Sequence, residues 1–406
     1  MAAGKPPVRT EPICSRMQGL APPPRRCALV VAGYCLVTLL ATLFLPMTAS
    51  AADQDNSIAK SADSDGLPGL PERPVTGTTP RWTVSAEAIV LGRMGGVSQP
   101  LVTRVPGSEP FYRTATVPGT EAFNSNQFRQ GFSAGPKVSL TYQDDSRWGA
   151  EVSYFNIFDQ SASKAIGPDS PADWLVMKAP GTFWQTQDFP YQAMAWKSTT
   201  SLYNVEANGR FNLSGRVTLL AGLRWLQLND NLQGTLTPAD LTAPTWKKHH
   251  FYDDIFQIKP GGPAGNYPPF WNTGTTNNLY GAQIGADVRI LEIGRFSLNG
   301  LIKTGIFDNN AAQSTGVSMQ KVVYPSQATT NNAAFVGEAG LQLKYKIGNG
   351  LALKVGYTAL WLDGVALAPG QIRETSTTQT SVRALGVNHG AGVLFQGATA
   401  GLEYSF

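Results

Sequence analysis

Residues able to do acid, base or metal chemistry are scarce in this sequence. Histidine occurs only three times. His249 and His250 lie in the polar stretch 247–254, and because adjacent histidines on an extended segment rarely converge on one metal ion, a solvated segment is the favoured interpretation. His389 and Ser381 would need a base-and-nucleophile geometry that no predicted strand supplies. We therefore expect no catalytic residue, no metal site and no cofactor, and the chain is predicted not to be an enzyme.

Many charged residues instead alternate with apolar ones. In the stretch 203–211, Glu206 and Arg210 fall on one face while Val205 and Phe211 fall on the other. A period of two places successive side chains on opposite faces of a β-strand, so one face of each such strand is expected to point into a polar interior. The charged residues predicted to line that interior are Glu87, Lys137, Glu151, Glu206, Arg210, Arg224, Asp287, Arg289, Lys303, Glu338, Lys344, Lys354 and Glu403.

The elements that carry these residues are predicted strands joined by connections of two kinds. Tight turns follow every second strand and long segments follow the others, which is typical of an outer-membrane barrel. A hairpin hidden between Gly92 and Gln130 would raise the strand count from ten to twelve. The stretches predicted as strands are 82–91, 136–143, 148–154, 203–211, 217–225, 279–290, 296–303, 335–345, 351–361 and 391–406.

The predicted fold is all-β: a transmembrane antiparallel up-and-down β-barrel of about ten strands, or twelve, with short periplasmic turns and long extracellular loops. A soluble β-sandwich also alternates, but it needs no aromatic residues at both ends of its strands. The aromatic residues expected at the turn end are Trp82, Tyr142, Trp148, Phe211, Phe296, Tyr345 and Phe406. Those expected at the loop end are Tyr154, Tyr203, Trp225, Tyr280, Phe335, Trp361 and Phe395.

The first 51 residues are predicted to be a signal peptide. Arg25 and Arg26 precede the apolar run 27–45, and the small residues 49–51 suit cleavage before Ala52. Because the run is long for a signal peptide, a retained membrane anchor is the alternative. The polar, Pro- and Gly-rich segment 52–80 has too little apolar matter for a core and is expected to be a flexible periplasmic lead-in to the barrel, 81–406.

Removal of this leader would change the composition of the chain. Cys14, Cys27 and Cys35 all lie in it, so the mature chain would have no disulfide and no thiolate metal site. The leader also holds five of the 32 basic residues and one of the 28 acidic residues, which leaves 27 of each. A neutral mature chain has no basic excess, so we expect no nucleic-acid partner.

Five segments resemble the β-barrel porin-7 family of outer-membrane proteins, and their order and spacing span most of the chain after the leader. The resemblance implies an integral outer-membrane barrel after secretion and leader removal, and it implies no catalytic residues. The terminal aromatic residues Tyr404 and Phe406 also resemble the C-terminal signal that the barrel-assembly machinery recognises. The segments are 132–142 (FSAGPKVSLTY), 221–230 (AGLRWLQLND), 277–287 (NNLYGAQIGAD), 294–311 (GRFSLNGLIKTGIFDNNA) and 363–372 (DGVALAPGQI).

Two functions remain open from the sequence, and the first is the favoured prediction. In the first, the inward charges line a narrow passive channel for small hydrophilic solutes, because a barrel of about ten to twelve strands leaves little room inside. In the second, the charges pair and close the interior, and the aromatic long loops 157–196 and 229–276 recognise surface glycans or another partner. Outer-membrane lipid is the expected surroundings in both.

Overall fold

The structure, a computed structural model, describes residues 82–106, 119–169, 173–177, 191–238, 270–319, 322–377 and 381–406. The predicted signal peptide 1–51 and lead-in segment 52–80 lie outside these residues. Ten strands of the described part form one closed antiparallel ring. They are β1 (Trp82–Gly95), β4 (Phe132–Gln143), β5 (Trp148–Ile166), β7 (Tyr191–Asn212), β8 (Val217–Pro238), β9 (Phe270–Ile293), β10 (Phe296–Met319), β11 (Val322–Gly348), β12 (Leu351–Val365) and β15 (Ala391–Ser405).

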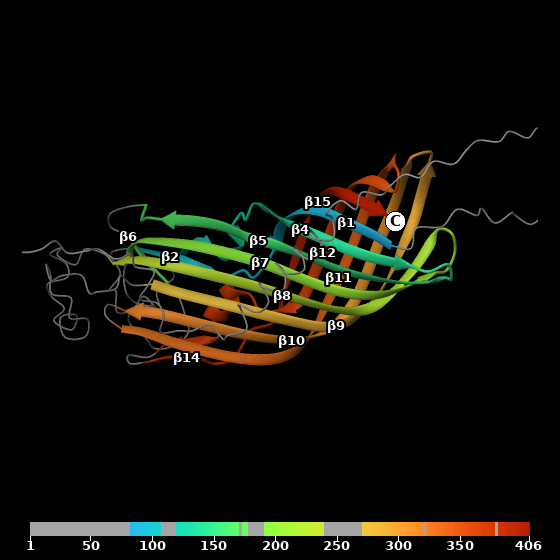
Figure 1. The fold of residues 1–406 in the computed structure, drawn as a ribbon. Coiled ribbons are helices and arrows are strands. Elements are labelled where there is room, and N and C mark those ends of the chain that lie inside the picture. The colour runs from blue at the N-terminus through green and yellow to red at the C-terminus, as the bar shows by residue number, and fades with distance from the viewer. Residues whose placement is uncertain are drawn as a thin grey trace, which may run out of the picture. The chain divides into compact units, whose positions relative to one another are not determined.

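The ring closes through its first and last strands. β1 pairs with β4 on one side and with β15 on the other, and β7 pairs with β8 to complete the circle. The backbone N–H of Trp82 donates to the carbonyl oxygen of Phe406 at 3.0 Å, and the N–H of Phe406 donates back at 2.9 Å. A closed ring leaves no unpaired edge over the length that all its strands share. The predicted antiparallel barrel of ten strands is confirmed (Figure 1).

The hairpin that would have made twelve strands exists, but it lies outside the ring. β2 (Pro100–Pro106) pairs with β3 (Thr120–Asn124). On its other side β2 pairs with β6 (Asp173–Val176), which contacts β7 through Leu175 and Tyr191. These three strands form a side extension at the loop end. A second small hairpin, β13 (Thr375–Thr377) with β14 (Val382–Ala384), follows the 3-10 helix η4 (Ala368–Ile372) in the β12–β15 connection.

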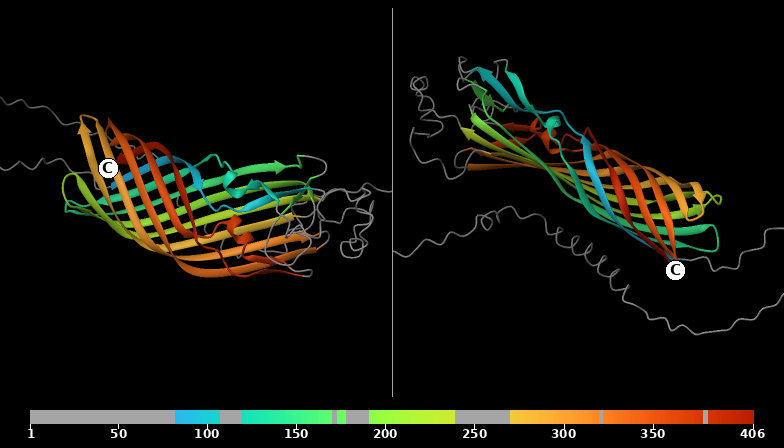
Figure 2. Two further views of the ribbon diagram at one scale, coloured as in Figure 1. Left: turned by 180° about the vertical axis from the view of Figure 1, so that it is seen from behind. Right: turned by 90° about the horizontal axis from the view of Figure 1, so that it is seen from above.

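The ring strands differ in length. β7 to β11 have 22 to 27 residues, whereas β1, β4, β12 and β15 have 12 to 15. All start or end together at the turns, so the long strands continue past the short ones at the loop end (Figures 1 and 2). Much of what the sequence indicated as long loops is therefore strand, including 191–202, 226–238 and 270–278.

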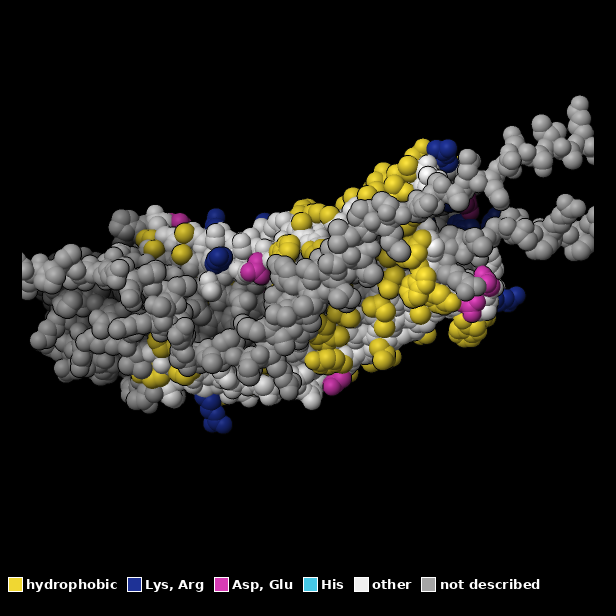
Figure 3. Space-filling view, in the orientation of Figure 1, with side chains coloured by type: hydrophobic (Ala, Val, Ile, Leu, Met, Phe, Trp, Pro, Cys, Tyr) yellow, Lys and Arg dark blue, Asp and Glu magenta, His cyan; other side chains and the backbone are white. Residues whose placement is uncertain are grey.

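The outer face carries an apolar belt between two aromatic rims. On β10 the outward residues Phe296, Ile302 and Ile306 are exposed, and the next outward residue is Asp308. About ten residues of a tilted strand match the hydrocarbon thickness of a bilayer. Figure 3 shows hydrophobic side chains gathered on the barrel wall toward the turn end, on the face that it draws. The belt gives the barrel the surface of a membrane-spanning protein.

Aromatic side chains meet at both rims of this belt. At the turn end the ring centroids of Trp82 and Tyr142, of Trp148 and Phe211, and of Phe296 and Tyr345 each lie 4.8 Å apart. At the loop end the centroids of Phe335 and Trp361 lie 5.4 Å apart. Phe395, which was expected at this rim, instead points into the barrel and is fully buried. Its position follows from the period of two, because it alternates with the outward residues Leu394 and Gln396.

None of the helices in the described part of the chain is long and apolar enough to cross a membrane.

Candidate functional site

The interior of the barrel is filled by side chains arranged in layers along its axis. Near the turn end, Lys303 Nζ lies 2.6 Å from Glu206 Oε1 and 3.9 Å from Glu151 Oε1. Arg210 Nη1 lies 2.5 Å from Glu151 Oε2, and its Nη2 lies 3.6 Å from Asp287 Oδ2. These five residues come from β5, β7, β9 and β10 and form one connected set of ion pairs across the lumen.

A second set of ion pairs completes this charged layer. Arg224 Nη1 lies 2.7 Å from Glu338 Oε2, and both side chains are buried. Lys354 Nζ lies 2.8 Å from Glu87 Oε1 and 3.4 Å from Glu403 Oε2. Lys344 also pairs with Glu403. Taking charges out of water is costly unless they are paired and hydrogen-bonded, which these are.

Two of the residues predicted to line the interior stand apart from these ion pairs. Lys137 is half-buried in β4, opposite Glu87 of β1 in the strand register. Arg289 is half exposed at the turn end, where its Nη1 lies 2.9 Å from Glu292 Oε2. A hydrogen bond from Lys346 and the positive charge of Arg289 lower the pKa of Glu292.

The charged layer is formally neutral. Without Arg289 it holds six acidic residues, Glu87, Glu151, Glu206, Asp287, Glu338 and Glu403, and six basic residues, Lys137, Arg210, Arg224, Lys303, Lys344 and Lys354. A field of one sign would favour passage of ions of the other sign. A neutral layer in which every member except Lys137 forms an ion pair provides no such field, and it is better suited to filling the lumen.

An apolar layer lies above the charged one. On β8 the successive inward residues are Arg224, Leu226, Leu228 and Asp230, so two leucines separate the two charges. The other strands contribute buried apolar residues at the same level, among them Ile89, Leu91, Phe155, Leu279, Phe307 and Phe395. The strand wall is shaped for this packing at Gly281, where an added Cβ would lie 2.5 Å from Phe307 Cγ. These side chains are buried and offer no groups that bind water.

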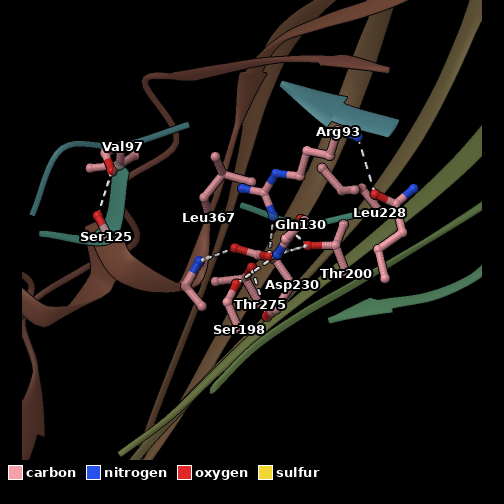
Figure 4. Close-up of polar contacts among 12 residues, drawn as sticks. Arg93, Val97, Ser125, Gln130, Ser198, Thr200, Leu228, Asp230, Thr275 and Leu367 are labelled. Atoms are coloured by element: carbon pink, nitrogen blue, oxygen red, sulfur yellow. Dashed lines mark hydrogen bonds and ion pairs between the residues drawn. The ribbon is translucent and has the colours of Figure 1, made fainter. Parts of the chain in front are cut away.

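A polar cluster lies above the apolar layer, centred on Asp230. Arg93 Nη1 lies 2.5 Å from Asp230 Oδ1, and the two side chains are 7% and 0% exposed. The Thr200 hydroxyl donates to Asp230 Oδ1 at 2.6 Å, and Arg93 also donates to Thr200. Figure 4 shows these side chains converging from β1, β7 and β8, with Gln130 and Ser198 beside them.

The connection between β12 and β15 enters the barrel at this level. We call residues 364–372 the inserted segment; Val365, Ala366, Leu367, Ala368 and Ile372 are each 0% exposed. Leu367 belongs to the apolar layer. Beyond it, a second apolar cluster fills the loop end and contains Trp196, Trp271, Met194, Tyr191, Leu232 and Ile372. Burial raises the pKa of the Tyr191 phenol.

The described residues include one of the three histidines, His389. Among them, no group of three or more His, Cys, Asp or Glu side chains could hold a metal ion. His249 and His250 lie outside the described residues. Asn388, next to His389, is bound to Gln371 within the β12–β15 connection. The Gln371 side chain accepts the Asn388 N–H at 2.9 Å and donates to the Asn388 carbonyl at 2.7 Å.

The residues that sequence reasoning missed are Arg93, Asp230 and Asn277. Each continues the inward period of its strand beyond the apolar belt, where the sequence indicated a loop. The signal was present, because 226–237 alternates without a break between inward Leu, Asp or Gly and outward Gln, Asn or Thr.

No protein-family model and no curated protein sequence matches the chain. Among solved structures, the outer membrane protease OmpT from Escherichia coli is similar at 8% identity and a TM-score of 0.45, over 81% of this chain and 98% of that chain. The Pseudomonas putida toluene transporter TodX is similar at 11% identity and a TM-score of 0.27, over 82% and 91%. The translocator domain of the Neisseria meningitidis autotransporter NalP is similar at 8% identity and a TM-score of 0.33, over 80% and 89%. At these values no activity or ligand is carried over to this chain.

Proposed function

We propose that this chain is an outer-membrane barrel whose interior is closed and which acts at the cell surface through the structure at its loop end. The observation that carries the proposal is the order of layers inside the barrel. Neutral ion pairs, then the apolar layer, then the buried Arg93–Asp230 pair and the inserted segment follow one another inside the barrel.

The apolar layer argues against the other candidate, a passive channel for small hydrophilic solutes. Such a solute needs a continuous polar or water-filled path, and here Leu226, Leu228, Phe307 and Phe395 belong to one buried apolar cluster. Carrying an ion past these side chains would strip its water without replacing it. The charged layer below does not supply that path, because its acidic side chains form ion pairs with basic side chains of the same layer.

The loop end provides the surface for a recognition role. Strands β7 to β11 continue past the apolar belt, and β11 extends 13 residues beyond Phe335, from Val322 to Ala334. Because a strand rises about 3.3 Å per residue, this part of the sheet extends some tens of ångströms beyond the membrane surface. Of the aromatic residues predicted to bind glycans, Tyr191, Trp196 and Trp271 are buried in the second apolar cluster and are not available for that role. The aromatic residues of 183–189 and 246–267 lie outside the described residues and keep the prediction open.

The proposed location rests on the barrel wall and on the chain's end. The apolar belt with its two aromatic rims suits outer-membrane lipid. Tyr404 and Phe406 lie exposed on β15 and at its end, with ring centroids 5.8 Å apart, where the assembly machinery would find them. The resemblance to the β-barrel porin-7 family stays a prediction.

Planar-bilayer recording of refolded 52–406 tests the closed interior. We expect no ion current from protein that shows heat-modifiable mobility on gels. Discrete current steps whose ion selectivity changes in a Lys303→Glu variant would overturn the closed barrel in favour of the channel.

Oligosaccharide binding on an immobilised panel tests the recognition role. The comparison protein replaces 240–268 by a short Gly-Ser linker; this is feasible because Thr235 pairs with Phe270, so the strand ends already lie side by side. We expect the intact protein to bind a subset of the panel and the shortened protein to lose that binding. Equal binding by both would remove this segment from the proposed role.

A further inference from the structure

The inserted segment begins at a glycine that no other residue could replace without strain. Gly364 has a φ of +78°, and the β12–β15 register shifts between Asp363 and Val365 at this point. A Cβ on Gly364 would lie 2.8 Å from the Ala333 carbonyl oxygen and 3.1 Å from Ala334 Cα. The positive φ and the close approach to β11 let the chain leave the barrel wall and turn into the lumen.

Wall side chains hold the main chain of the inserted segment. Asn277 on β9 accepts the N–H of Ala366 at 2.7 Å and donates to the carbonyl of the same residue at 2.8 Å. The Thr275 hydroxyl donates to that carbonyl at 2.9 Å. Asp230 Oδ2 accepts the N–H of Ala368 at 2.9 Å. Three wall residues therefore satisfy the polar groups that a buried loop would otherwise leave unpaired.

The same wall also fixes the entry of the segment. Asn309 on β10 donates to the Gly364 carbonyl at 3.0 Å, and Asn332 on β11 donates to it at 2.8 Å. Two side chains of the inserted segment, Val365 and Leu367, belong to the apolar layer. Polar groups of the wall therefore bind the main chain of the inserted segment, while two of its apolar side chains pack into the apolar layer.

We propose that residues 364–372 are a plug that keeps the loop-end mouth of the lumen shut, and that Asn277, Thr275 and Asp230 form a clasp that seats it. Release of the clasp frees the plug and admits water to the apolar layer below. The proposal rests on the closed interior proposed above and names the device that maintains the closure at this end.

Cysteine labelling in otherwise cysteine-free 52–406 tests the plug. The reporter is Ala334→Cys, whose parent side chain faces the lumen beside Gly364 and is 5% exposed. Its matched control is Ala333→Cys, the adjacent position, which faces outward. With an intact clasp we expect a methanethiosulfonate reagent to modify the outward cysteine readily and the inward one slowly.

Clasp variants should change only the inward reporter. In an Asn277→Ala/Thr275→Val background, we expect roughly tenfold or faster modification of Ala334→Cys, because each buried hydrogen bond that is lost shifts a local opening equilibrium by up to about that factor. The matched background is Asn278→Ala/Asn229→Ala, which removes the outward amides of the same strands and leaves the plug's partners in place. We expect no change there.

A plug-deleted protein decides the case if the clasp variant does not fold. Val365 pairs with Ala391, so a short linker can replace 366–390. Rapid modification of Ala334→Cys in that protein, judged folded by its heat-modifiable mobility, supports the plug. Continued protection would overturn it. Bilayer current from the protein with intact clasp and plug would instead refute the closed interior itself, so the two failures are distinguishable.

Discussion

Arg93 of β1 and Asp230 of β8 lie 137 positions apart in the sequence and form an ion pair of 2.5 Å inside the barrel. The two strands are not neighbours in the ring, since β4, β5 and β7 lie between them on one side. The pair therefore crosses the lumen and is not a contact between neighbouring strands. It also links the wall to the plug, because Asp230 accepts the N–H of Ala368.

Breaking this ion pair from one side should be costly. Asp230→Leu leaves the Arg93 cation buried without a partner, and we expect a loss of about 3 to 5 kcal/mol in the free energy of unfolding. Urea unfolding of refolded protein in detergent micelles measures it. The double variant Arg93→Met/Asp230→Leu should recover part of the loss, because no unpaired charge remains although the Ala368 N–H still lacks its acceptor. A double variant as unstable as the single one would contradict this account.

Gly281, which borders the apolar layer, is predicted not to tolerate a larger residue. Gly281→Ala places a Cβ 2.3 Å from the Ile306 carbonyl oxygen and 2.5 Å from Phe307 Cγ, so we expect destabilisation of about 1 to 3 kcal/mol. Gly209→Ala is the control, because its Cβ would meet nothing nearer than the Ala221 carbonyl oxygen at 3.6 Å. The temperature at which heat-modifiable mobility is lost compares the two. Equal temperatures would mean that the wall relaxes around the new methyl group.

The membrane-spanning part of the fold could be predicted from the sequence because lipid imposes a strict rule on it. Outward residues there must be apolar, inward residues are polar or small, and both aromatic rims mark where a strand leaves the bilayer. Ile284 between inward Gln283 and Gly285 is typical. Above the belt that rule ends. Outward Asn229, Thr276 and Asn278 resemble a polar loop in composition, so the strand extensions were missed although the alternation continued.

The sequence predicts which residues point into the interior, but it does not predict which of them form ion pairs. Alternation selects Glu206 and Lys303 as inward residues, but their ion pair depends on which strands face each other across the ring. The plug was harder still to predict from the sequence. The run 363–372 contains Gly, Pro and small apolar residues that suit many loops, and its burial depends on Asn277 and Asp230, which are distant in the sequence.

The turn end predicts a pH-dependent contact. Lys346 and Arg289 hold the pKa of Glu292 below its ordinary value, so the contact stabilises the fold above the unfolded pKa of that glutamate and is lost as the pH falls through the folded pKa. Titration of Glu292 by NMR should show the lowered pKa, and Lys346→Met should move it back toward the ordinary value. The effect on stability is expected to be small, because the pair is exposed to solvent. An unchanged pKa in the variant would exclude the Lys346 hydrogen bond as the cause.

The C-terminal aromatic residues predict a defect in assembly without a defect in folding. In cells, Tyr404→Ala/Phe406→Ala should lower the amount of heat-modifiable protein in the outer-membrane fraction, because the assembly machinery would lose its signal. The purified variant should still refold in detergent, since both side chains lie on the outer face and are exposed. Ser405→Ala, which leaves both rings in place, is the control. If the variant lost heat-modifiable protein equally in cells and on refolding in detergent, the two aromatic rings would contribute to stability and not to assembly.

The apolar belt predicts where a charge is tolerated on the outer face. Ile302 on β10 lies within the belt and is exposed to its surroundings, so Ile302→Lys should cost about 2 to 4 kcal/mol for refolding into lipid vesicles. Thr329 on β11 also faces outward, but it lies six residues beyond the Phe335 rim, and Thr329→Lys should cost close to nothing. Equal effects at the two positions would mean that the surroundings do not change along the strands. A cost that falls off between them would locate the membrane surface at the level of Phe335 and Trp361, and would leave the clasp and the plug on its aqueous side.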